Sequence, residues 1–329
     1  MNSPYEKPLI SVLTPSWDRA KFLPMLISSL KKQTFKNFEW IIGNDGSSDG
    51  THELLLSAFE KLDFRVTYIN SSLRIGKAKM DNMLVDNANA DYLLWCDADD
   101  YFSPHAFKDL YEASKEIPPH EKGNYIGVLA QNHNTFGVSQ TFSNNYLPPS
   151  NKHYLWEELK EYLAGDGTIL IYREHFVKKR FLEEDFLVQE SSLLQEIFKN
   201  KKFYFIENVV KIMDRTAENS ISFGKKLSYC RGSAIAIAVS INQALFDELN
   251  LRNKLKTILA YWRYSFHGDF SYLKAKKLWP IADTNFAISF LYPISLIICI
   301  RDILLNKVEK THIEFFDNIK KTDIKINRL

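Results

Sequence analysis

The stretch Tyr92-Leu93-Leu94-Trp95-Cys96-Asp97-Ala98-Asp99-Asp100 joins a short apolar run directly to three acidic residues. Residues 92–96 have the length and composition of a buried strand, so the acids fall where that strand ends. Carboxylates at positions i and i+2 can converge on one hard cation, such as Mg²⁺ or Mn²⁺, that also takes phosphate oxygens. A helix cap or a solvated turn would use the same residue types, so the surrounding sequence has to decide.

Strands and helices alternate along the hundred residues around this stretch. The ranges with strand character are 9–14, 38–43, 64–70 and 92–96, and those with helical spacing of apolar residues are 22–32, 50–62 and 77–87. This alternation predicts an α/β fold with a mostly parallel sheet flanked by helices. Ligands of such sheets bind beyond the carboxyl ends of the strands. We therefore expect the polar clusters at 44–49 and 97–100 to face one crevice.

The remaining sequence changes character near residue 224. Before it we expect short β-like segments in 123–142, helices at 156–163 and 191–199, a strand at 168–172, and a strand pair or bent strand at 203–214. After it the pattern is helical, with runs near 232–248, 251–266 and 286–305. These patterns predict an α/β domain over 1–224 and a helical C-terminal region over 225–329.

Composition excludes several classes of protein. The formal net charge is only +2, whereas a general nucleic-acid binder needs a concentrated basic face. Cys96, Cys230 and Cys299 fit no metal-ligand spacing, so we interpret them as buried small apolar residues in a reducing compartment. Residues 1–8 carry charge and proline without an apolar core, unlike a secretory signal. These features predict a cytoplasmic protein that does not bind nucleic acid.

The C-terminal region has the composition of a membrane-surface element. Its longest uncharged stretch, residues 284–300, includes a proline and is shorter than the roughly 20 residues that span a bilayer. Its basic neighbours are Lys274, Lys276, Lys277, Arg301 and Lys307. A helical hairpin with this basic rim can lie on an anionic membrane. Packing against the α/β domain or a partner subunit, including a second copy, is the alternative.

The cluster at 43–51 offers groups that suit a nucleotide. Asp45 carries an acceptor for the imide N–H of a nucleobase, and the glycines around it permit close approach of the backbone. A β-turn followed by a helix cap at Ser48 or Asp49 explains the same residues and is compatible with that role. Arg74 would supply a fixed cation near the base or the phosphates, unless it is an ordinary surface residue.

These blocks, in this order and spacing, resemble the family 2 glycosyltransferases over roughly residues 8–222. Residues 14–19 (Thr-Pro-Ser-Trp-Asp-Arg) are similar to the family's first-strand motif, which usually ends in Tyr-Asn-Arg. Residues 44–51 are similar to its Asp-Asp-Gly-Ser block. The resemblance implies the GT-A fold, a Rossmann-like sheet that binds a nucleotide-diphospho-sugar donor.

The resemblance also assigns roles to individual residues. It places Asp97 and Asp99 in a DXD element on the ribose and on Mn²⁺ or Mg²⁺, with Asp99 as a metal ligand beside Asp97. The donor-binding residues that it implies are Pro15, Asp18, Asp45, Arg74, Asp97, Ala98 and Arg215. Three positions depart from the family pattern: Asp18 replaces Asn, Asn44 replaces Asp, and Asp81 replaces the Arg before Asn82.

Two later segments bear on catalysis. Residues 181–184 and 188–191 are similar to the family's Phe-Asp-Glu and Glu-Asp elements, which implies that Glu190 is the catalytic base. Inversion needs a carboxylate that deprotonates the acceptor hydroxyl on the face opposite the leaving diphosphate. Glu184 and Asp185 are competitors for this role, and a solvated carboxylate at a helix start is the alternative for Glu190.

The segment 214–222 is similar to the family's closing segment, in which Arg-x-His precedes a loop over the diphosphate. Ala217 stands where that His is common. The resemblance therefore assigns no third protein ligand to the metal, and Arg215 is expected to carry more of the phosphate charge.

We accordingly expect an inverting, nonprocessive, metal-dependent transferase. Its donor would be a UDP-sugar, and its acceptor a lipid-linked or other glycan in bacterial surface polysaccharide assembly, at the inner face of the cytoplasmic membrane. The sequence lacks the Gln-x-x-Arg-Trp element of processive polymer synthases. A sugar nucleotidyltransferase is an alternative, although it would need a Gly-rich loop after the first strand, where Pro15-Ser16-Trp17-Asp18 stands. A noncatalytic scaffold with the same fold is another alternative.

Overall fold

The computed structural model divides the chain into two compact units. Unit 1 comprises Met1–Phe181, Ile197–Ala217 and Phe316–Leu329, and unit 2 comprises Leu182–Glu196 and Glu218–Phe315. The residues that the structure describes are 7–142, 147–177, 179–184, 188, 190–214, 216, 230–241, 246–247, 249–281, 284–305 and 323–329.

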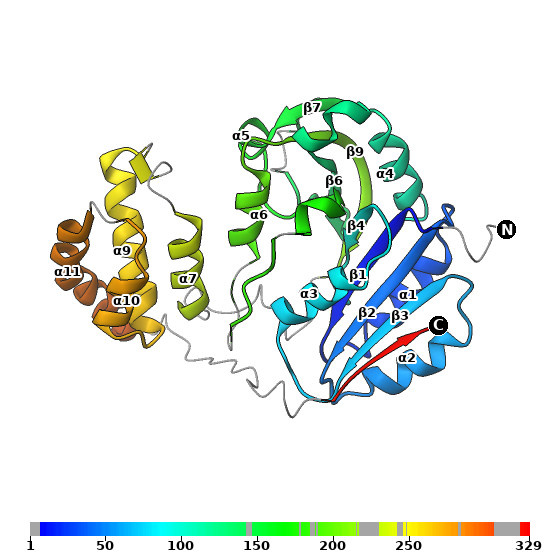
Figure 1. Ribbon diagram of the computed structural model, residues 1–329, viewed down its shortest axis with the longest axis horizontal. Coiled ribbons are helices and arrows are strands. Elements are labelled where there is room, and N and C mark those ends of the chain that lie inside the picture. The colour runs from blue at the N-terminus through cyan, green and yellow to red at the C-terminus, as the bar shows by residue number, and fades with distance from the viewer. Residues whose placement is uncertain are drawn as a thin grey trace. The chain divides into compact units, whose positions relative to one another are not determined.

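Unit 1 is built on one mixed sheet (Figure 1), whose strand order is β10-β3-β2-β1-β4-β8-β6-β9-β5, with β7 paired to β9. The strands are β1 Ile10–Ser16, β2 Phe38–Asp45, β3 Arg65–Ser71, β4 Tyr92–Trp95, β5 Asp100–Phe102, β6 Tyr125–Asn134, β7 Lys152–Leu155, β8 Thr168–Tyr172, β9 Lys202–Met213 and β10 Ile324–Arg328. β3, β2, β1 and β4 are parallel, as the alternating pattern predicts. The α/β fold class is therefore confirmed.

Helices cover both faces of this parallel part. The helices before residue 200 are α1 Leu23–Lys31, α2 Thr51–Phe59, α3 Lys77–Asp86, α4 Ala106–Ser114, α5 Trp156–Leu159 and α6 Ser191–Phe198, with 3-10 turns at Pro119–Asn124 and Arg173–Phe176. Apolar side chains of α1, α2 and α4 share one core with alternate residues of β1 and β2, including Val12 and Trp40. α3 packs on β1 and β2 through Met80, which lies over Gly43. Every helix and strand predicted before residue 100 is present, within a few residues at each end.

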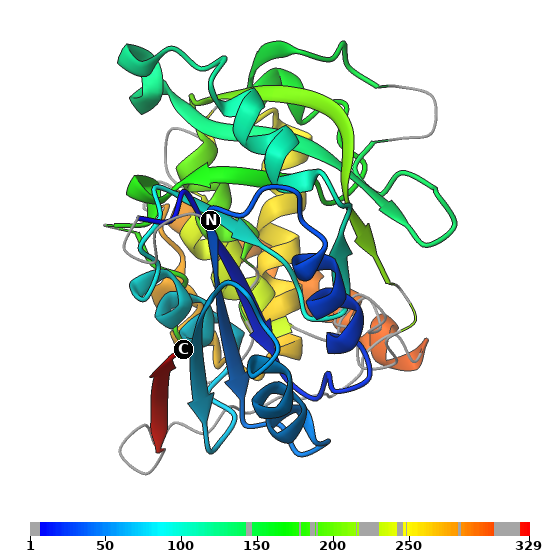
Figure 2. The same ribbon diagram turned by 90° about the vertical axis from the view of Figure 1, so that its right-hand side faces the viewer.

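Two differences from the predicted elements are informative. The region 123–142 contains one long strand, β6, where short segments were expected. The range 203–214, expected as a strand pair or a bent strand, forms one strand, β9, whose register against β6 shifts. The segment predicted as helical over 225–329 includes a strand, β10, which pairs antiparallel with β3 at the sheet edge (Figure 2). Ile324 and Ile326 alternate with polar residues, and this period-2 pattern suits an edge strand.

Unit 2 is helical in its described residues. It contains most of α6 and, after residue 217, the helices α7 Cys230–Ser240, α9 Leu251–His267, α10 Tyr272–Leu278 and α11 Asn285–Leu304. Aromatic residues fill its core: Tyr261 and Trp262 of α9 are buried, and the Trp262 indole N–H donates to the Ile288 carbonyl at 2.7 Å. Asp302 of α11 is fully buried and accepts two hydrogen bonds from Arg263, at 2.5 and 2.8 Å. This bidentate ion pair ties α11 to α9.

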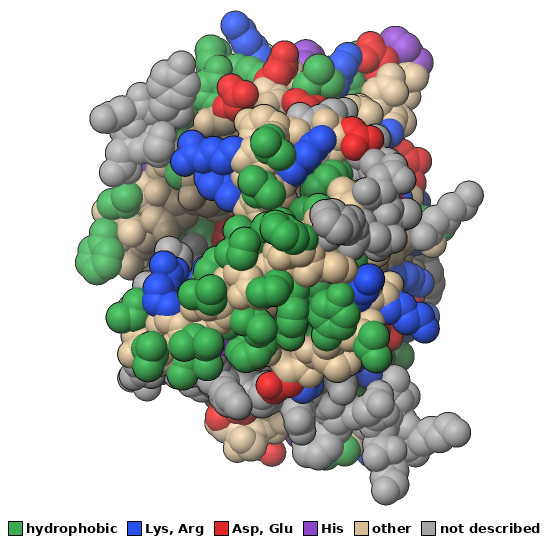
Figure 3. Space-filling model, turned by 90° about the vertical axis from the view of Figure 1, so that its left-hand side faces the viewer, with side chains coloured by type: hydrophobic (Ala, Val, Ile, Leu, Met, Phe, Trp, Pro, Cys, Tyr) green, Lys and Arg blue, Asp and Glu red, His purple; other side chains and the backbone are tan. Residues whose placement is uncertain are grey.

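One described helix is long and apolar enough to cross a membrane, judged by length and composition alone: Ala287–Leu304 within α11. Only 28% of this segment is buried in the structure. Figure 3 shows hydrophobic side chains gathered on the side where α11 lies in Figure 1, with Lys and Arg side chains beside them.

Candidate active site

The loops that follow β1 and β2 are joined by hydrogen bonds. Because Ser16 lies opposite Asn44 in the parallel pairing, the two loops leave the sheet at the same edge. The Asp18 amide donates to the Ser47 hydroxyl at 2.9 Å, and the Asp18 carboxylate accepts from the Ser48 amide at 2.8 Å. Asp18 therefore fixes the turn after Asp45, and it does so at φ 49°, a left-handed conformation that aspartate tolerates.

Asp45 anchors the segment that carries Arg74. Its carboxylate is 4% exposed and accepts hydrogen bonds from the backbone amides of Ile75, at 2.6 Å, and Gly76, at 3.0 Å. Burial raises the pKa of Asp45 to about 6, although these two hydrogen bonds and the charge of Arg74 oppose the shift. Each carboxylate oxygen keeps a second lone pair, so Asp45 can accept one more hydrogen bond from a ligand.

A tight approach of two loops explains the glycine after Asp45. Gly46 has φ +65°, and a Cβ atom there would lie 2.4 Å from the carbonyl carbon of Leu73. Any other residue would therefore push away the segment that precedes Arg74. The close approach that Gly46 permits here is to the loop before α3, and an approach of the backbone to a nucleotide stays a prediction.

Arg74, whose charge acts on Asp45, stacks on the ring of Trp17. The guanidinium carbon of Arg74 lies 3.4 Å from the ring centroid of Trp17, which is a stacked cation–π contact. The sequence prediction gave Arg74 a role and left Trp17 out. An aromatic residue in the first-strand motif was the signal that could have identified it.

The three acids after β4 differ in exposure, and each faces a protein cation. The Asp97 side chain is 52% exposed and lies 3.5 Å from the Lys77 ammonium group. Asp99 is 16% exposed, 3.4 Å from Arg19 Nε, and the nearly buried Asp100 is 3.2 Å from Lys211 Nζ. Pro15, Asp18, Asp45 and Arg74 lie at or just after the carboxyl ends of the neighbouring strands β1, β2 and β3, and Ala98, between two of the acids in the sequence, is buried.

The charges of this cluster influence one another. Removal from water opposes ionisation of Asp97, but the ammonium groups of Lys77 and Lys211 lower its pKa. Burial raises the pKa of Asp99, and the charge of Asp97 adds to the shift. Burial alone would favour the neutral form of Lys211. The nearby carboxylates outweigh this effect, with the largest contribution from Asp100, and raise the pKa of Lys211 above the usual lysine value. Lys211 is therefore a fixed positive charge beneath the acids.

Sequence reasoning missed three charged residues of this site. Lys211 on β9 reaches the acids because β5 pairs with β9, which brings Phe102 opposite Lys211. Lys77 and Asp81 face each other one turn apart on α3, with 3.1 Å between Nζ and Oδ2. Asp81 had been noted only as a departure from the family pattern. The spacing of a Lys and an Asp at i and i+4 was the signal available for that pair.

Asp97 and Asp99 suit a hard divalent cation whose remaining coordination positions are filled by a bound ligand and water. Among the described residues, no group of three or more His, Cys, Asp or Glu side chains is arranged to hold a metal ion. Mg²⁺ and related ions are commonly held by one or two carboxylates together with substrate phosphates and water. Asp97 and Asp99, at i and i+2 and partly exposed, supply that kind of donor set.

The predicted catalytic base lies in the other unit. Glu190 is half-buried in unit 2, where its carbonyl accepts from the amides of Leu193 and Leu194 at 3.1 Å and so begins α6. Glu190 thus lies at a helix start, as its noncatalytic alternative expects. Its role as the catalytic base stays a prediction. Its competitor Glu184 also belongs to unit 2. Asp185, Arg215 and Ala217 lie outside the described residues.

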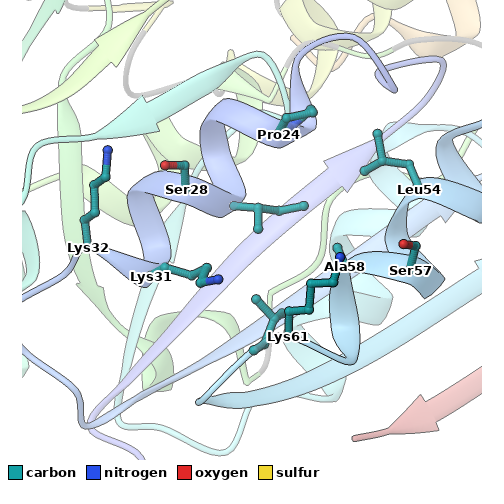
Figure 4. Close-up of a pocket in the computed structure, with 10 residues that line it drawn as sticks. Pro24, Ser28, Lys31, Lys32, Leu54, Ser57, Ala58 and Lys61 are labelled. Carbon is teal, nitrogen blue, oxygen red and sulfur yellow. The ribbon is translucent and has the colours of Figure 1, made fainter.

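A separate pocket of about 540 Å³ lies between α1 and α2. Figure 4 shows side chains that line it, which come from both helices and from the residues just after them, and Lys31 and Lys61 are among them. None of the site residues described above lines this pocket.

Comparison with known proteins places the chain in a family. The family model for Glycosyl transferase family 2 matches residues 11–181, just over half of the chain. The chain is 27% identical over 218 residues to the GalNAc(5)-diNAcBac-PP-undecaprenol beta-1,3-glucosyltransferase of Campylobacter jejuni, with 66% of this chain and 68% of the relative covered. It is 32% identical over 108 residues to glycosyltransferase GlyG of Streptococcus pneumoniae, covering 33% of this chain and 36% of GlyG.

A solved structure agrees in fold. Residues 1–349 of TarS from S. aureus, in complex with UDP-GlcNAc, superpose with a TM-score of 0.54 at 16% identity, with 97% of each chain covered. At that identity the likeness concerns the fold alone. The strand order, the loops after β1, β2 and β4, and the family match lead to one conclusion: the chain belongs to glycosyl transferase family 2 and is a glycosyltransferase with a GT-A fold.

Proposed function

We propose that the protein transfers a sugar from a UDP-sugar, with inversion and one residue at a time, to a lipid-linked or other glycan of the bacterial surface. One observation carries this proposal: Asp45, Arg74 and Trp17 and the acids Asp97 and Asp99 all lie at or just after the carboxyl ends of neighbouring parallel strands, at one sheet edge. Groups suited to a base and groups suited to a diphosphate are thereby brought together.

The nucleoside would bind beside Trp17. The face of a uracil ring can stack near the Trp17–Arg74 pair, and its imide N–H can donate to Asp45. Support for UDP comes from TarS, which was solved with UDP-GlcNAc and shares this fold. The C. jejuni relative is by its name a glucosyltransferase that acts on an undecaprenol-linked glycan, which supports the lipid-linked acceptor.

Asp97 and Asp99 would hold Mn²⁺ or Mg²⁺, and a bound cation there would stabilise the negative charge on the departing diphosphate. Arg19 and Lys211, which already face the acids, hold the carboxylates in place and limit their mutual repulsion. Glu190 would accept the proton of the attacking hydroxyl. A carboxylate suits this step because it need only be ionised at neutral pH and lie opposite the leaving group.

Calorimetric titration tests the donor site. The wild-type protein should bind UDP with Mn²⁺ present, and binding should weaken greatly with EDTA. Asp99→Ala should lose this metal-dependent binding at an unchanged melting temperature, because a loop acid crowded by another acid adds little to folding stability. Asp63→Ala, which removes an acid that is 68% exposed, is the matched control.

Two results would contradict the proposal. Wild-type protein that binds none of UDP, GDP, CMP or dTDP would favour the noncatalytic scaffold. Full Mn²⁺-dependent binding in Asp99→Ala would remove Asp99 from the cation site. The anomeric configuration of the product, read by NMR, separates inversion from retention.

The exposed side of α11 supports a second part of the proposal, contact with the cytoplasmic face of an anionic membrane. Its exposed apolar residues are Phe290, Ile294, Ile297, Ile300, Ile303 and Leu304. The opposite side packs on α9, and the fully buried Asp302 holds it there. Arg301 is 61% exposed in its side chain, and α10 adds Lys274 and Lys277 at the surface. Apolar residues bordered by cations are typical of a helix that lies in the membrane interface.

Vesicle flotation tests this contact. The protein should float with vesicles that contain anionic phospholipid and much less with neutral vesicles. Ile297→Glu should reduce flotation several-fold, whereas Leu56→Glu, at an exposed apolar position of α2, should not. If Ile297→Glu floats like the wild type, the face serves another partner. A concentration-dependent mass in light scattering would then identify that partner as a second copy.

A further inference from the structure

Lys77 occupies a position that the proposed donor site does not by itself explain. Its ammonium group lies 3.1 Å from Asp81 Oδ2 and 3.5 Å from Asp97 Oδ1, and its side chain is 22% exposed. It therefore stands between a fully buried carboxylate and a half-exposed one that we propose to bind a cation. Arg19 pairs with Asp99 and Lys211 with Asp100, whereas Lys77 lies between two carboxylates, those of Asp81 and Asp97.

The backbone and the buried partner hold Lys77 in place. It is the first residue of α3, directly after Ile75 and Gly76, whose amides are bound by Asp45. Asp81 is 0% exposed and accepts the indole N–H of Trp95 at 3.1 Å, which fixes the carboxylate that faces Lys77. The ammonium group is thus kept at the edge of the acid cluster even when Asp97 changes partner.

The cation that Asp97 would bind competes with Lys77. One carboxylate oxygen cannot hold an ammonium group and a divalent cation at full strength, because the two positive charges repel each other at such short distances. A diphosphate relieves this conflict, since its oxygens accept both the cation and the displaced ammonium group. Binding of the cation and of the diphosphate would then strengthen each other by the same factor.

We propose that Lys77 makes divalent-cation binding depend on the donor diphosphate: it shields Asp97 from the free cation and turns to the phosphates when both bind. Asp81 is the positioning residue that keeps Lys77 available for both states. This inference rests on the proposed donor site, and it concerns the order in which that site is filled.

Calorimetry of the full chain tests the proposal without a measurement of turnover. Mn²⁺ is titrated alone and in the presence of saturating UDP. In the wild type, UDP should tighten Mn²⁺ binding about tenfold or more, within the usual range of coupling between sites. Lys77→Gln keeps a hydrogen-bond donor for Asp81 but removes the charge. It should bind Mn²⁺ alone about fivefold more tightly, and UDP should then add correspondingly less.

Asp81→Asn should act in the opposite direction. This variant keeps an acceptor for the Trp95 indole but removes the negative charge of Asp81. Of the two carboxylates beside Lys77, only Asp97 then remains charged, so Lys77 should hold Asp97 more firmly. Mn²⁺ alone should therefore bind more weakly than in the wild type. If Lys77 and Asp81 had a purely structural role, Lys77→Gln and Asp81→Asn would change the affinity for Mn²⁺ in the same direction. Lys77→Arg should restore the coupling, and Lys115→Gln, at an exposed ion pair with Glu112, is the control that should change nothing.

The outcomes separate this inference from the proposed function. A wild type that binds no Mn²⁺ with UDP would refute the donor site itself. A wild type with strong coupling beside an unchanged Lys77→Gln would overturn only the role of Lys77, as would a shift of both variants in one direction. If Asp81→Asn does not fold, Lys77→Gln and Lys77→Arg still decide the matter.

Discussion

Replacement of Asp45 by asparagine should change how folding stability varies with pH. Burial raises the pKa of this carboxyl from 3.8 to about 6 in the folded protein. A carboxyl with a raised folded pKa gives stability that is fully present below its unfolded pKa and is lost as pH rises through its folded pKa. Ionised Asp45 therefore costs the folded state about 3 kcal/mol, since each pKa unit corresponds to about 1.4 kcal/mol.

Urea unfolding at about pH 4.5 and about pH 7.5 measures this cost. Between these values the wild type should lose about 2 kcal/mol of stability relative to Asp45→Asn, because the window covers most of the titration. The asparagine side chain has only one oxygen, so its NH₂ group will face one of the two backbone N–H donors that Asp45 accepts. This should lower the variant's free energy of unfolding by about 1–3 kcal/mol at both pH values, and the change in stability between the two pH values is then unaffected. Other titrating groups are common to both proteins and cancel.

The same substitution at the exposed Asp63 provides the matched surface control. A gap between wild type and Asp45→Asn that stays constant with pH, or that moves in favour of the wild type as pH rises, would refute the description of Asp45 as a buried carboxyl with a raised pKa.

Two further substitutions test the site from other directions. Glu190→Gln should bind UDP and Mn²⁺ like the wild type but lose about 10²-fold or more in turnover, because the base acts on the acceptor; weakened donor binding would assign Glu190 another role. Gly46→Ala should lower the melting temperature far more than Gly50→Ala, because both glycines have positive φ but only Gly46 would place its Cβ against backbone, at 2.4 Å from Leu73. Equal losses would show that strain in φ, and not crowding, sets the cost.

The parallel part of the sheet was predictable because its signals are local. Each strand from β1 to β4 is a short segment of strand character, the first three are followed by helical patterns, and the polar clusters fall where strands end. Asp45 and Asp97 could therefore be assigned to one sheet edge from spacing alone. The family resemblance added the roles of donor-binding residues, which spacing cannot supply.

The rest of the site depends on contacts that no local pattern encodes. Lys211 reaches Asp100 only because β5 pairs with β9, a pairing between segments about a hundred residues apart. The stacking of Arg74 on Trp17 joins two loops in the same way. In the sequence Asp81 is only a departure from the family pattern, yet in the fold this buried carboxylate pairs with Lys77 and accepts a hydrogen bond from Trp95.

The pairing of β10 with β3 affects the order in which the protein can fold during synthesis. The larger part of unit 2, Glu218–Phe315, is made after β9 and before β10, so β10 is the last of the described strands that the ribosome delivers. Until then, β3 presents backbone N–H and C=O groups along an open edge, which other chains can extend by strand addition. Released chains truncated before Ile324 should therefore aggregate more readily than the full chain, even though every residue of the acid cluster is already in place.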